Sequence, residues 1–455
     1  MYRRHSLISV KLASSFVFAT IAMGCGEDEV DRCGELDGVC PSSCTAKRDP
    51  DCPEKADYYV APDGDDGNSG DLAHPFKTLN RAHEVATAGT LVYFREGTYP
   101  PRDPERNGIS LEGIDGRADA MIRFWAYPGE RVVFDFSTLE DNQYPLRAIM
   151  FSGDYWHWKG IDVVGTPQYP GQSMSAAFVV GDSNHCTFEQ MRIHDNFGTG
   201  FVLKGNSTDN LVLNSDAYDN QDPVDAYENA NGFMSVTDEG TSNTFRGCRA
   251  WWNSDDGFDH FNGNGVVIHE GCWSFWNGYV PQTFEHGGTG NGMGFKFGDS
   301  QYTQGKVTRV ATGCLAFKNF AFGFDQNALR DAIRVQNCTA FKNVEYGIRL
   351  PHQWPEYTPL HIVQNCLAYE NGRDAFVNEG STDDHNSWNT DVTVTDADFL
   401  SLDSEGVDGP RNPDGSLPNL DFLKLAPDSD LIDRGVDIDL QFAGKAPDLG
   451  AFESE

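Results

Sequence analysis

A short acidic segment, NSDDGFDHFNG at residues 253–263, holds the side chains best suited to chemistry. Asp255, Asp256 and Asp259 fall within five positions, and two phenylalanines are interleaved with them. Carboxylates packed so closely repel one another, so either a bound cation or full solvation must make the arrangement tolerable. Ca²⁺ prefers several carboxylate oxygens, and the segment therefore suggests a calcium site. The competing interpretation is a solvated acidic turn in which Asp259 forms a structural salt bridge.

The acidic segment belongs to a repeat that runs through the middle of the chain. A strand-like unit closed by an asparagine recurs with gaps of 24, 33, 24, 42, 24 and 28 residues, and the closing residues are Asn196, Asn220, Asn253, Asn277, Asn319, Asn343 and Asn371. A base period of 24 with loop insertions indicates stacked repeats. Short strands joined by tight turns at this period favour an all-β fold, a right-handed parallel β-helix.

Two columns of side chains are expected from this repeat. The asparagines would stack at one turn, where each side-chain amide satisfies its neighbour in the next coil. The repeated cysteines would line the interior as small apolar groups, and they are Cys248, Cys272, Cys314, Cys338 and Cys366. A disulfide between adjacent coils is the alternative role for them.

One corner of the repeat carries two insertions, roughly residues 221–230 and 278–293. Insertions gathered at one corner of a solenoid tend to build its binding face. Because side chains alternate across a strand, the outward row beside this corner is Val202, Met234, Asp259, Lys296, Asp325 and Arg349. The turn position places Asn231 over Asp256. One face should therefore collect Asn231 and the three aspartates, with Lys296 in the adjacent coil.

Three segments at this corner resemble polysaccharide lyase family 9, whose members are pectate lyase-like β-helix enzymes. They are NANGF at 229–233, NSDDGFD at 253–259 and GNGMGFK at 290–296. The resemblance implies a lyase that cleaves a uronic-acid polymer, above all pectate or polygalacturonate, by β-elimination. It also implies that Asn231, Asp255, Asp256 and Asp259 hold Ca²⁺ and that Lys296 is the catalytic base. The chain departs from the family at Asn231, where aspartate is usual, so one negative charge is lost.

The two ends of the domain, residues 57–455, also resemble such enzymes. YYVAPDG at 58–64 and PFKTL at 75–79 are similar to their opening segment, and DLGAFE at 448–453 is similar to their closing segment. A short helix from about Lys77 is expected to cap the first coil.

The formal net charge of -35 excludes nucleic acid as a partner, because a polyanion would be repelled. Contacts with an acidic polysaccharide must then be local, and the candidates are Lys204, His260, Arg330 and Arg349. Two other functions stay open: a glycoside hydrolase that uses two of the carboxyl groups, and a calcium-stabilised surface protein that binds carbohydrate without cleaving it.

The N-terminal residues indicate export. Residues 1–24 read as a signal peptide, and Cys25 stands where a bacterial lipoprotein would carry its lipid, with an ordinary signal peptide as the alternative. Residues 25–56 contain Cys33, Cys40, Cys44 and Cys52, which suggest a small two-disulfide tether rather than a zinc site. We therefore expect a monomer that is secreted or on the cell surface, attached to a membrane only through that lipid.

Overall fold

The computed structural model describes residues 40, 44–49, 52–101, 103, 108–141, 144–300, 303–351 and 358–454. The predicted export signal, Cys25 and Cys33 lie outside these residues. Within them, Cys40 and Cys52 form a disulfide, and Cys44 is also disulfide-bonded. Among the described residues, no helix has the length and apolar composition needed to cross a membrane.

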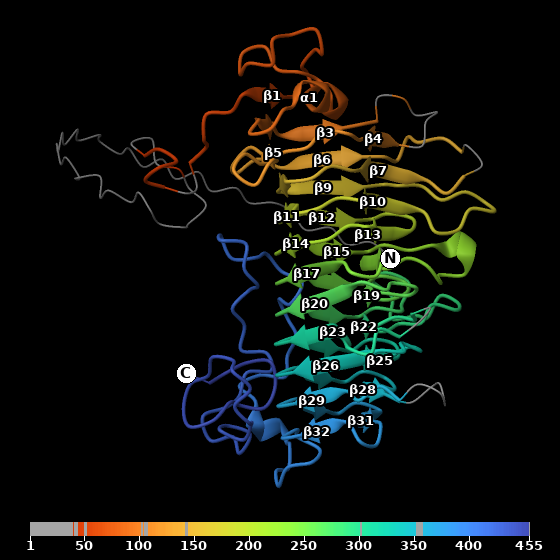
Figure 1. Cartoon of the computed structure of the whole chain (residues 1–455), viewed down its shortest axis with the longest axis vertical. Helices are drawn as coiled ribbons and strands as arrows, with labels where there is room; N and C mark the ends of the chain where they lie inside the picture. Colours follow the sequence, from red (N-terminus) through yellow and green to blue (C-terminus); the bar gives the residue numbers. More distant parts are fainter. Residues whose placement is uncertain are drawn as a thin grey trace, which may run out of the picture.

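Three parallel sheets wind around one axis as a right-handed β-helix, which confirms the predicted fold (Figure 1). Each strand pairs with the strand one coil before it and the strand one coil after it in the same sheet. The long sheet contains β1 (Tyr58–Val60), β2 (Leu91–Phe94), β5 (Ile122–Ala126), β8 (Trp156–Lys159), β11 (Thr187–Glu189), β14 (Asn210–Leu213), β17 (Ser242–Arg246), β20 (Val266–Glu270), β23 (Val307–Thr312), β26 (Ala332–Gln336), β29 (Ile362–Gln364) and β32 (Thr382–Asp384).

Two further sheets, which we call the site sheet and the covered sheet, complete each coil. The site sheet contains β4 (Ile109–Leu111), β7 (Arg147–Phe151), β10 (Ala176–Gly181), β13 (Thr199–Gly205), β16 (Phe233–Thr237), β19 (Phe258–Asp259), β22 (Phe295–Lys296), β25 (Phe322–Asp325), β28 (Tyr346–Leu350) and β31 (Arg373–Val377). The covered sheet contains β3 (Gly97–Tyr99), β6 (Val132–Asp135), β9 (Ile161–Val164), β12 (Arg192–His194), β15 (Asp216–Tyr218), β18 (Arg249–Trp251), β21 (Trp273–Phe275), β24 (Leu315–Phe317), β27 (Thr339–Phe341) and β30 (Leu367–Tyr369).

A helix closes the N-terminal end of the stack, as predicted. Helix α1 (Leu79–Val85) begins after Thr78, whose hydroxyl accepts a hydrogen bond of 3.1 Å from the backbone N–H of Arg81. Leu79 and Ala82 are buried in the main core. Two short 3₁₀ turns, η1 (Pro223–Asp225) and η2 (Asp396–Asp398), lie in connections.

Stacked side chains hold the coils in register. The rings of Phe258 and Phe295 stack inside at 4.8 Å, and the repeated cysteines are buried in the same core and free, as predicted. The predicted asparagine column is also present: Asn253 Nδ2 donates to Asn277 Oδ1 at 3.0 Å, and Asn277 Nδ2 donates to Asn319 Oδ1 at 3.0 Å. Because each amide satisfies the next, the ladder fixes the turn that leads into the site sheet.

Breaking this ladder should destabilise the protein strongly. In an Asn343→Ala variant, the carbonyl of Ala316 and the amides of Asn319 and Asn371 lose their buried partner. We expect the free energy of unfolding to fall by about 3 kcal/mol, as measured by denaturant titration. The exposed Asn206→Ala serves as a control and should change it by less than about 0.5 kcal/mol. An equal change in the free energy of unfolding for the two substitutions would contradict a stabilising role of the asparagine ladder.

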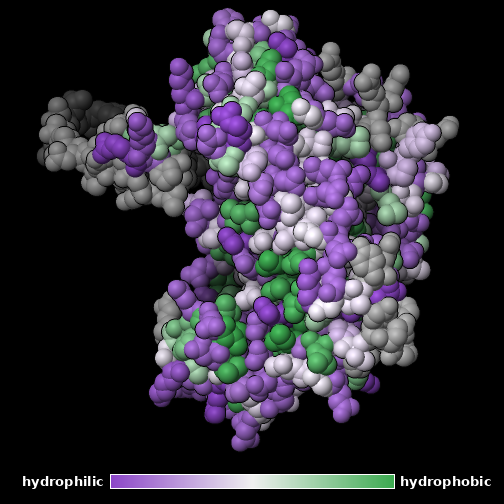
Figure 2. Space-filling view, viewed as in Figure 1, coloured by the Kyte–Doolittle hydropathy of each residue, from purple (hydrophilic) through white to green (hydrophobic). Residues whose placement is uncertain are grey.

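The C-terminal segment, residues 399–452, packs on the outside of the covered sheet. Phe422 contacts Phe317 with ring centroids 4.9 Å apart, and the closing residue Leu449 is buried in the same cluster. The predicted alternation of buried and exposed positions is therefore wrong for strands such as β24, which are buried on both faces. Figure 2 shows a mainly hydrophilic surface, with hydrophobic atoms gathered where this segment meets the coils.

Candidate active site

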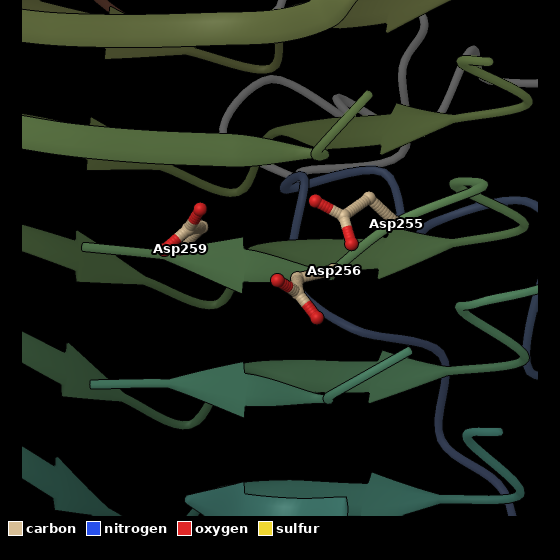
Figure 3. Close-up of side chains that lie close together, drawn as sticks. All are labelled: Asp255, Asp256 and Asp259. Carbon is tan, nitrogen blue, oxygen red and sulfur yellow. The ribbon is translucent and has the colours of Figure 1, made fainter. Parts of the chain in front are cut away.

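One coil supplies all three aspartates of the acidic segment. Asp255 and Asp256 lie in the turn after Asn253, and Asp259 lies on β19 (Figure 3). Two backbone bonds hold the turn between its neighbours: Asp255 N donates to Ala230 O at 3.2 Å, and Gly257 N donates to Met293 O at 2.9 Å. One carboxylate oxygen from each aspartate lies within 4.8 Å of the other two.

The cluster is buried, so the interpretation as a solvated turn is wrong. Asp255, Asp256 and Asp259 are exposed to only 1%, 0% and 3%. Buried carboxylates need compensating donors or cations, because desolvation disfavours their charged form. The cluster therefore depends on the partners that surround it.

Backbone N–H groups satisfy one oxygen of each carboxylate. Asn291 N donates to Asp255 Oδ1 at 2.6 Å, Met293 N to Asp256 Oδ1 at 2.7 Å, and Phe261 N to Asp259 Oδ1 at 2.8 Å. Asn291 and Met293 close the insertion at residues 278–293, so this insertion contributes directly to the acidic cluster. The second oxygens of Asp256 and Asp259 turn toward Lys296.

Lys296 stands in the next coil, in register with Asp259 as predicted. Its Nζ lies 2.9 Å from Asp256 Oδ2 and 3.4 Å from Asp259 Oδ2, and the side chain is 6% exposed. Burial lowers the pKa of the Lys296 ammonium, but the carboxylates of Asp256, Asp259 and Asp255 outweigh burial and hold the pKa well above its usual range. With the carboxylates uncompensated, Lys296 is an ammonium and no base.

The two aspartates of the turn resist ionisation. Burial, reinforced by the charge of Asp256, raises the pKa of Asp255 well above its usual range. Burial likewise raises the pKa of Asp256 to about 6, although Lys296 opposes the rise. Full ionisation of both carboxylates would place an excess of negative charge in the buried cluster. A bound cation would compensate that charge.

Asn231 completes the cluster from the coil before. Its Oδ1 accepts a hydrogen bond of 3.1 Å from Asp256 N, and its Nδ2 donates to Asp259 Oδ2 at 3.3 Å. The amide thus fixes Asp256 and Asp259 relative to each other. The three close carboxylates are a donor set that suits Ca²⁺, and Asn231 holds two of them in place.

The cluster opens into a cleft that follows the site sheet. The cleft has a volume of about 630 Å³ and runs from Arg147 on β7 past Lys296 to Asn327 beyond β25. Asn231, Asp255, Asp259 and Lys296 all line it. A cleft along the coil axis suits an extended polymer.

The residues predicted to contact substrate lie in different parts of the structure. Lys204 is exposed and lines the cleft. Arg349 pairs with Asp325, with its Nε 2.5 Å from Asp325 Oδ1. Arg330 does not line the cleft; its backbone N–H donates to Ser300 Oγ at 3.2 Å.

His260 is buried inside the coil, so its predicted contact with substrate is wrong. Its Nε2 lies 3.0 Å from His269 Nε2, and burial together with His269 and Arg309 lowers its pKa well below the usual range. A neutral imidazole in the interior cannot reach a substrate in the cleft.

Sequence reasoning missed three residues that line the cleft, namely Phe261, Asn291 and Arg147. Phe261 is half-exposed in the cleft, and its ring centroid lies 5.5 Å from Lys296 Nζ. Asn291 binds Asp255 through its backbone, and Arg147 lies at the far end. The position of Asn291 between the glycines of GNGMGFK could have indicated a backbone contact.

Comparisons with known proteins identify the family of the chain. Residues 58–354 match the family model described as "Pel9A-like, right handed beta helix region". "Pectate lyase L" of Dickeya dadantii is 35% identical over 91% of this chain and 94% of its own. The crystal structure of pectate lyase Pel9A aligns with a TM-score of 0.74 and 32% identity over 88% of this chain and 96% of that one. A solved "Rhamnogalacturonan lyase" aligns at 0.73 and 30%, covering 82% and 96%. The chain is therefore a polysaccharide lyase that belongs to the Pel9A-like right-handed β-helix family.

Proposed function

We propose that this protein is a calcium-dependent lyase that cleaves a uronic-acid polymer by β-elimination, with Lys296 as the base. The observation that carries the proposal is the position of Lys296 Nζ, 2.9 Å from Asp256 Oδ2 at the floor of the cleft. Polygalacturonate is the first substrate to test, because similar proteins are named pectate lyases.

Each residue of the site would have a separate role in the β-elimination. Bound Ca²⁺ would compensate the negative charge of the uronate carboxylate. Lys296 Nζ, as the free amine, would take the proton from C5 of the uronate. A double bond would form between C4 and C5 as the bond from C4 to the glycosidic oxygen breaks, and water would protonate the departing oxygen. Phe261 beside Lys296 would exclude water from the amine.

Neutralising the negative charge of the acidic cluster would also allow Lys296 to lose its proton and act as the base. Asp256 and Asp259 hold Lys296 in its protonated form through their negative charge. Once that charge is balanced, burial of the side chain favours the neutral amine. The base would therefore act only in the loaded site.

The hydrolase alternative has less support. A glycosidase needs an acid and a second carboxylate placed on either side of the scissile bond. Both oxygens of Asp325 are engaged by Arg349, and the other three carboxylates form one tight group beside a lysine.

The decisive experiment follows product formation in the ultraviolet. The full chain is incubated with polygalacturonate, alginate or a glycosaminoglycan in the presence of Ca²⁺, and each digest is analysed by mass spectrometry. We expect products with unsaturated uronate ends, which absorb in the ultraviolet. Saturated products would support a hydrolase, and binding without products would support a non-catalytic surface protein.

Restoring the missing charge at residue 231 should tighten calcium binding. In Asn231→Asp, a fourth carboxylate joins the cluster, and we expect the Kd for Ca²⁺ measured by calorimetry to fall by roughly 10-fold or more. The calcium-free variant should unfold at a lower temperature than the parent, because the added charge is buried. Asn262→Asp, which adds the same charge at an exposed position of the cleft, is the matched control. An equal gain in both variants would show a general charge effect.

We further propose that the protein acts outside the reducing cytoplasm, where such polymers occur. The Cys40–Cys52 disulfide supports this location, because disulfides persist in oxidising compartments.

A further inference from the structure

A second cleft lies on the outer face of the covered sheet, beside the C-terminal segment. It has a volume of about 620 Å³, and it is lined by residues of β12, β15 and β18 and by the loop at residues 408–413. In Figure 1 the C-terminal segment, in blue, lies on the opposite side of the coils from the strands of the site sheet. Among the described residues, none lines both this second cleft and the cleft that contains Lys296.

Two arginines that share one aspartate fix the loop at this second cleft. Arg249, on β18, pairs with Asp216 and donates from Nη1 to Val407 O and to Gly409 O, both at 2.9 Å. Arg411, within the loop, pairs with Asp216 as well, at 2.6 Å. Burial raises the pKa of Asp216, but the two guanidinium groups outweigh burial and hold that pKa below its usual range. The second cleft is therefore preformed, and the charge of its buried aspartate is balanced.

Arg192, on β12, is the cation of the second cleft that remains available for a ligand. Its Nε donates to Asp162 Oδ1 at 2.5 Å, and its side chain is 42% exposed. Within the part of the chain that the structure describes, its two terminal nitrogens have no hydrogen-bond partner. A guanidinium that is fixed at Nε presents its terminal nitrogens as a fork, which matches the two oxygens of a carboxylate.

Two side-chain amides line the second cleft together with Arg192. Gln190 and Asn214 occupy equivalent turns of successive coils, with φ of 52° and 48°. Their backbone N–H groups bond to the next coil, but their side-chain amides make no hydrogen bond to another described residue. An amide offers both donors and an acceptor, which suits the hydroxyl groups of a sugar.

Rings complete the lining of the second cleft. Tyr218 and Trp251 stack with their ring centroids 4.3 Å apart, and Pro410 and Pro413 line the cleft from the loop. Ligand pockets typically combine such apolar surface with a few polar groups that fix orientation. The lining therefore suits a sugar ring that carries a carboxylate.

The remaining acidic groups of the second cleft leave room for an anionic ligand. Both oxygens of Asp219 accept from Gln282 Nε2, at 2.9 and 3.2 Å. Asp408 is exposed, so solvent and salt screen its charge. Arg192 is thus the charged group that a ligand can pair with directly.

We propose that the second cleft is a non-catalytic binding site for a uronate unit of an acidic polysaccharide. The carboxylate would pair with the terminal nitrogens of Arg192, and hydroxyl groups of the sugar would bond to Gln190 and Asn214. A polymer strand held there would raise the local concentration of substrate at the other cleft. The inference goes beyond the proposed function, because it concerns binding on a face that does not contain Lys296.

Hydrogen–deuterium exchange of the full chain locates the bound sugar without any substitution. The protein, kept in chelator to prevent calcium-dependent cleavage, is incubated with tetragalacturonate or with a neutral galactose tetrasaccharide. We expect only tetragalacturonate to slow amide exchange at residues 408–415 and 214–219. Unchanged exchange at these residues, or equal protection by both sugars, would overturn the proposal.

Substitution of Arg192 makes the test quantitative. Arg192→Gln removes the charged fork, and Asp162 keeps its pairing with Arg131. The Kd for tetragalacturonate, taken from protection at residues 408–415, should rise by about 10-fold or more, because charge-assisted hydrogen bonds are lost. Arg246→Gln is the matched control, since Arg246 pairs with Glu270 and lines neither cleft; it should leave that Kd unchanged. An equal Kd in Arg192→Gln and the parent would assign the bound carboxylate to another group and overturn the proposal.

The second cleft and the proposed lyase function can fail separately. Protection at residues 408–415 in a protein that forms no unsaturated product would retain the second binding site and remove the proposed reaction. Unsaturated products without that protection would remove the second binding site and leave the lyase intact.

Discussion

Lys296→Met should lower kcat by about 10²–10⁴-fold on any polymer that the parent cleaves, because the amine that takes the C5 proton is lost. Methionine keeps the length and apolar stem of the side chain but cannot accept a proton. Calcium binding should survive, since removing a positive charge beside Asp256 and Asp259 favours a cation there. Initial rates of ultraviolet-absorbing product at saturating Ca²⁺ measure the loss, and calorimetry measures the binding.

Lys296→Arg separates the charge of the side chain from its basicity. The guanidinium preserves the pairing with the carboxylates but does not lose its proton in proteins, so this variant should be as inactive as Lys296→Met. In the parent, the rate should rise with pH until the amine of Lys296 is fully deprotonated. Retention of kcat within about 10-fold in either variant would assign the base to another group.

The repeat made the outward face of the coils predictable. A period of 24 fixes which residues stack, and alternation along a strand fixes which of them point out, so the row from Val202 to Arg349 has the expected register. The same rule explains the error at His260. A residue directly after the outward Asp259 must point inward, and the side chain is buried beside His269.

Irregular segments could not be placed in this way. The insertion at residues 278–293 has no period, so the glycines around Asn291 could suggest a backbone contact but not which carboxylates the N–H groups of Asn291 and Met293 reach. The C-terminal segment likewise has no repeat to set its position against the covered sheet. Its apolar residues, such as Phe422, find their partners only through the folded structure.

Asp255→Asn should weaken Ca²⁺ binding on the order of 100-fold, because one buried ligand charge is removed. Excess Ca²⁺ should restore kcat, since Lys296 pairs with Asp256 and Asp259 and is left in place. Treatment of the parent with a chelator should abolish cleavage, and added Ca²⁺ should return it. Titrations of activity against free Ca²⁺ give the apparent Kd of each protein.

Stability in chelator offers a readout that does not depend on turnover. Burial and the charge of Asp256 raise the pKa of Asp255, so its ionised form destabilises the calcium-free fold at neutral pH. Asp255→Asn should then be more stable than the parent by about 1–2 kcal/mol in chelator and lose that advantage in Ca²⁺. The exposed Asp238→Asn should show neither effect.

Asp256 should make the stability of the calcium-free parent depend on pH. The folded state holds the proton of Asp256, with a pKa of about 6, more tightly than the unfolded chain does. The calcium-free parent should therefore lose stability as the pH rises toward and through 6. If chelator changed neither activity nor stability, the cluster would be a structural ion-pair network around Lys296 rather than a cation site.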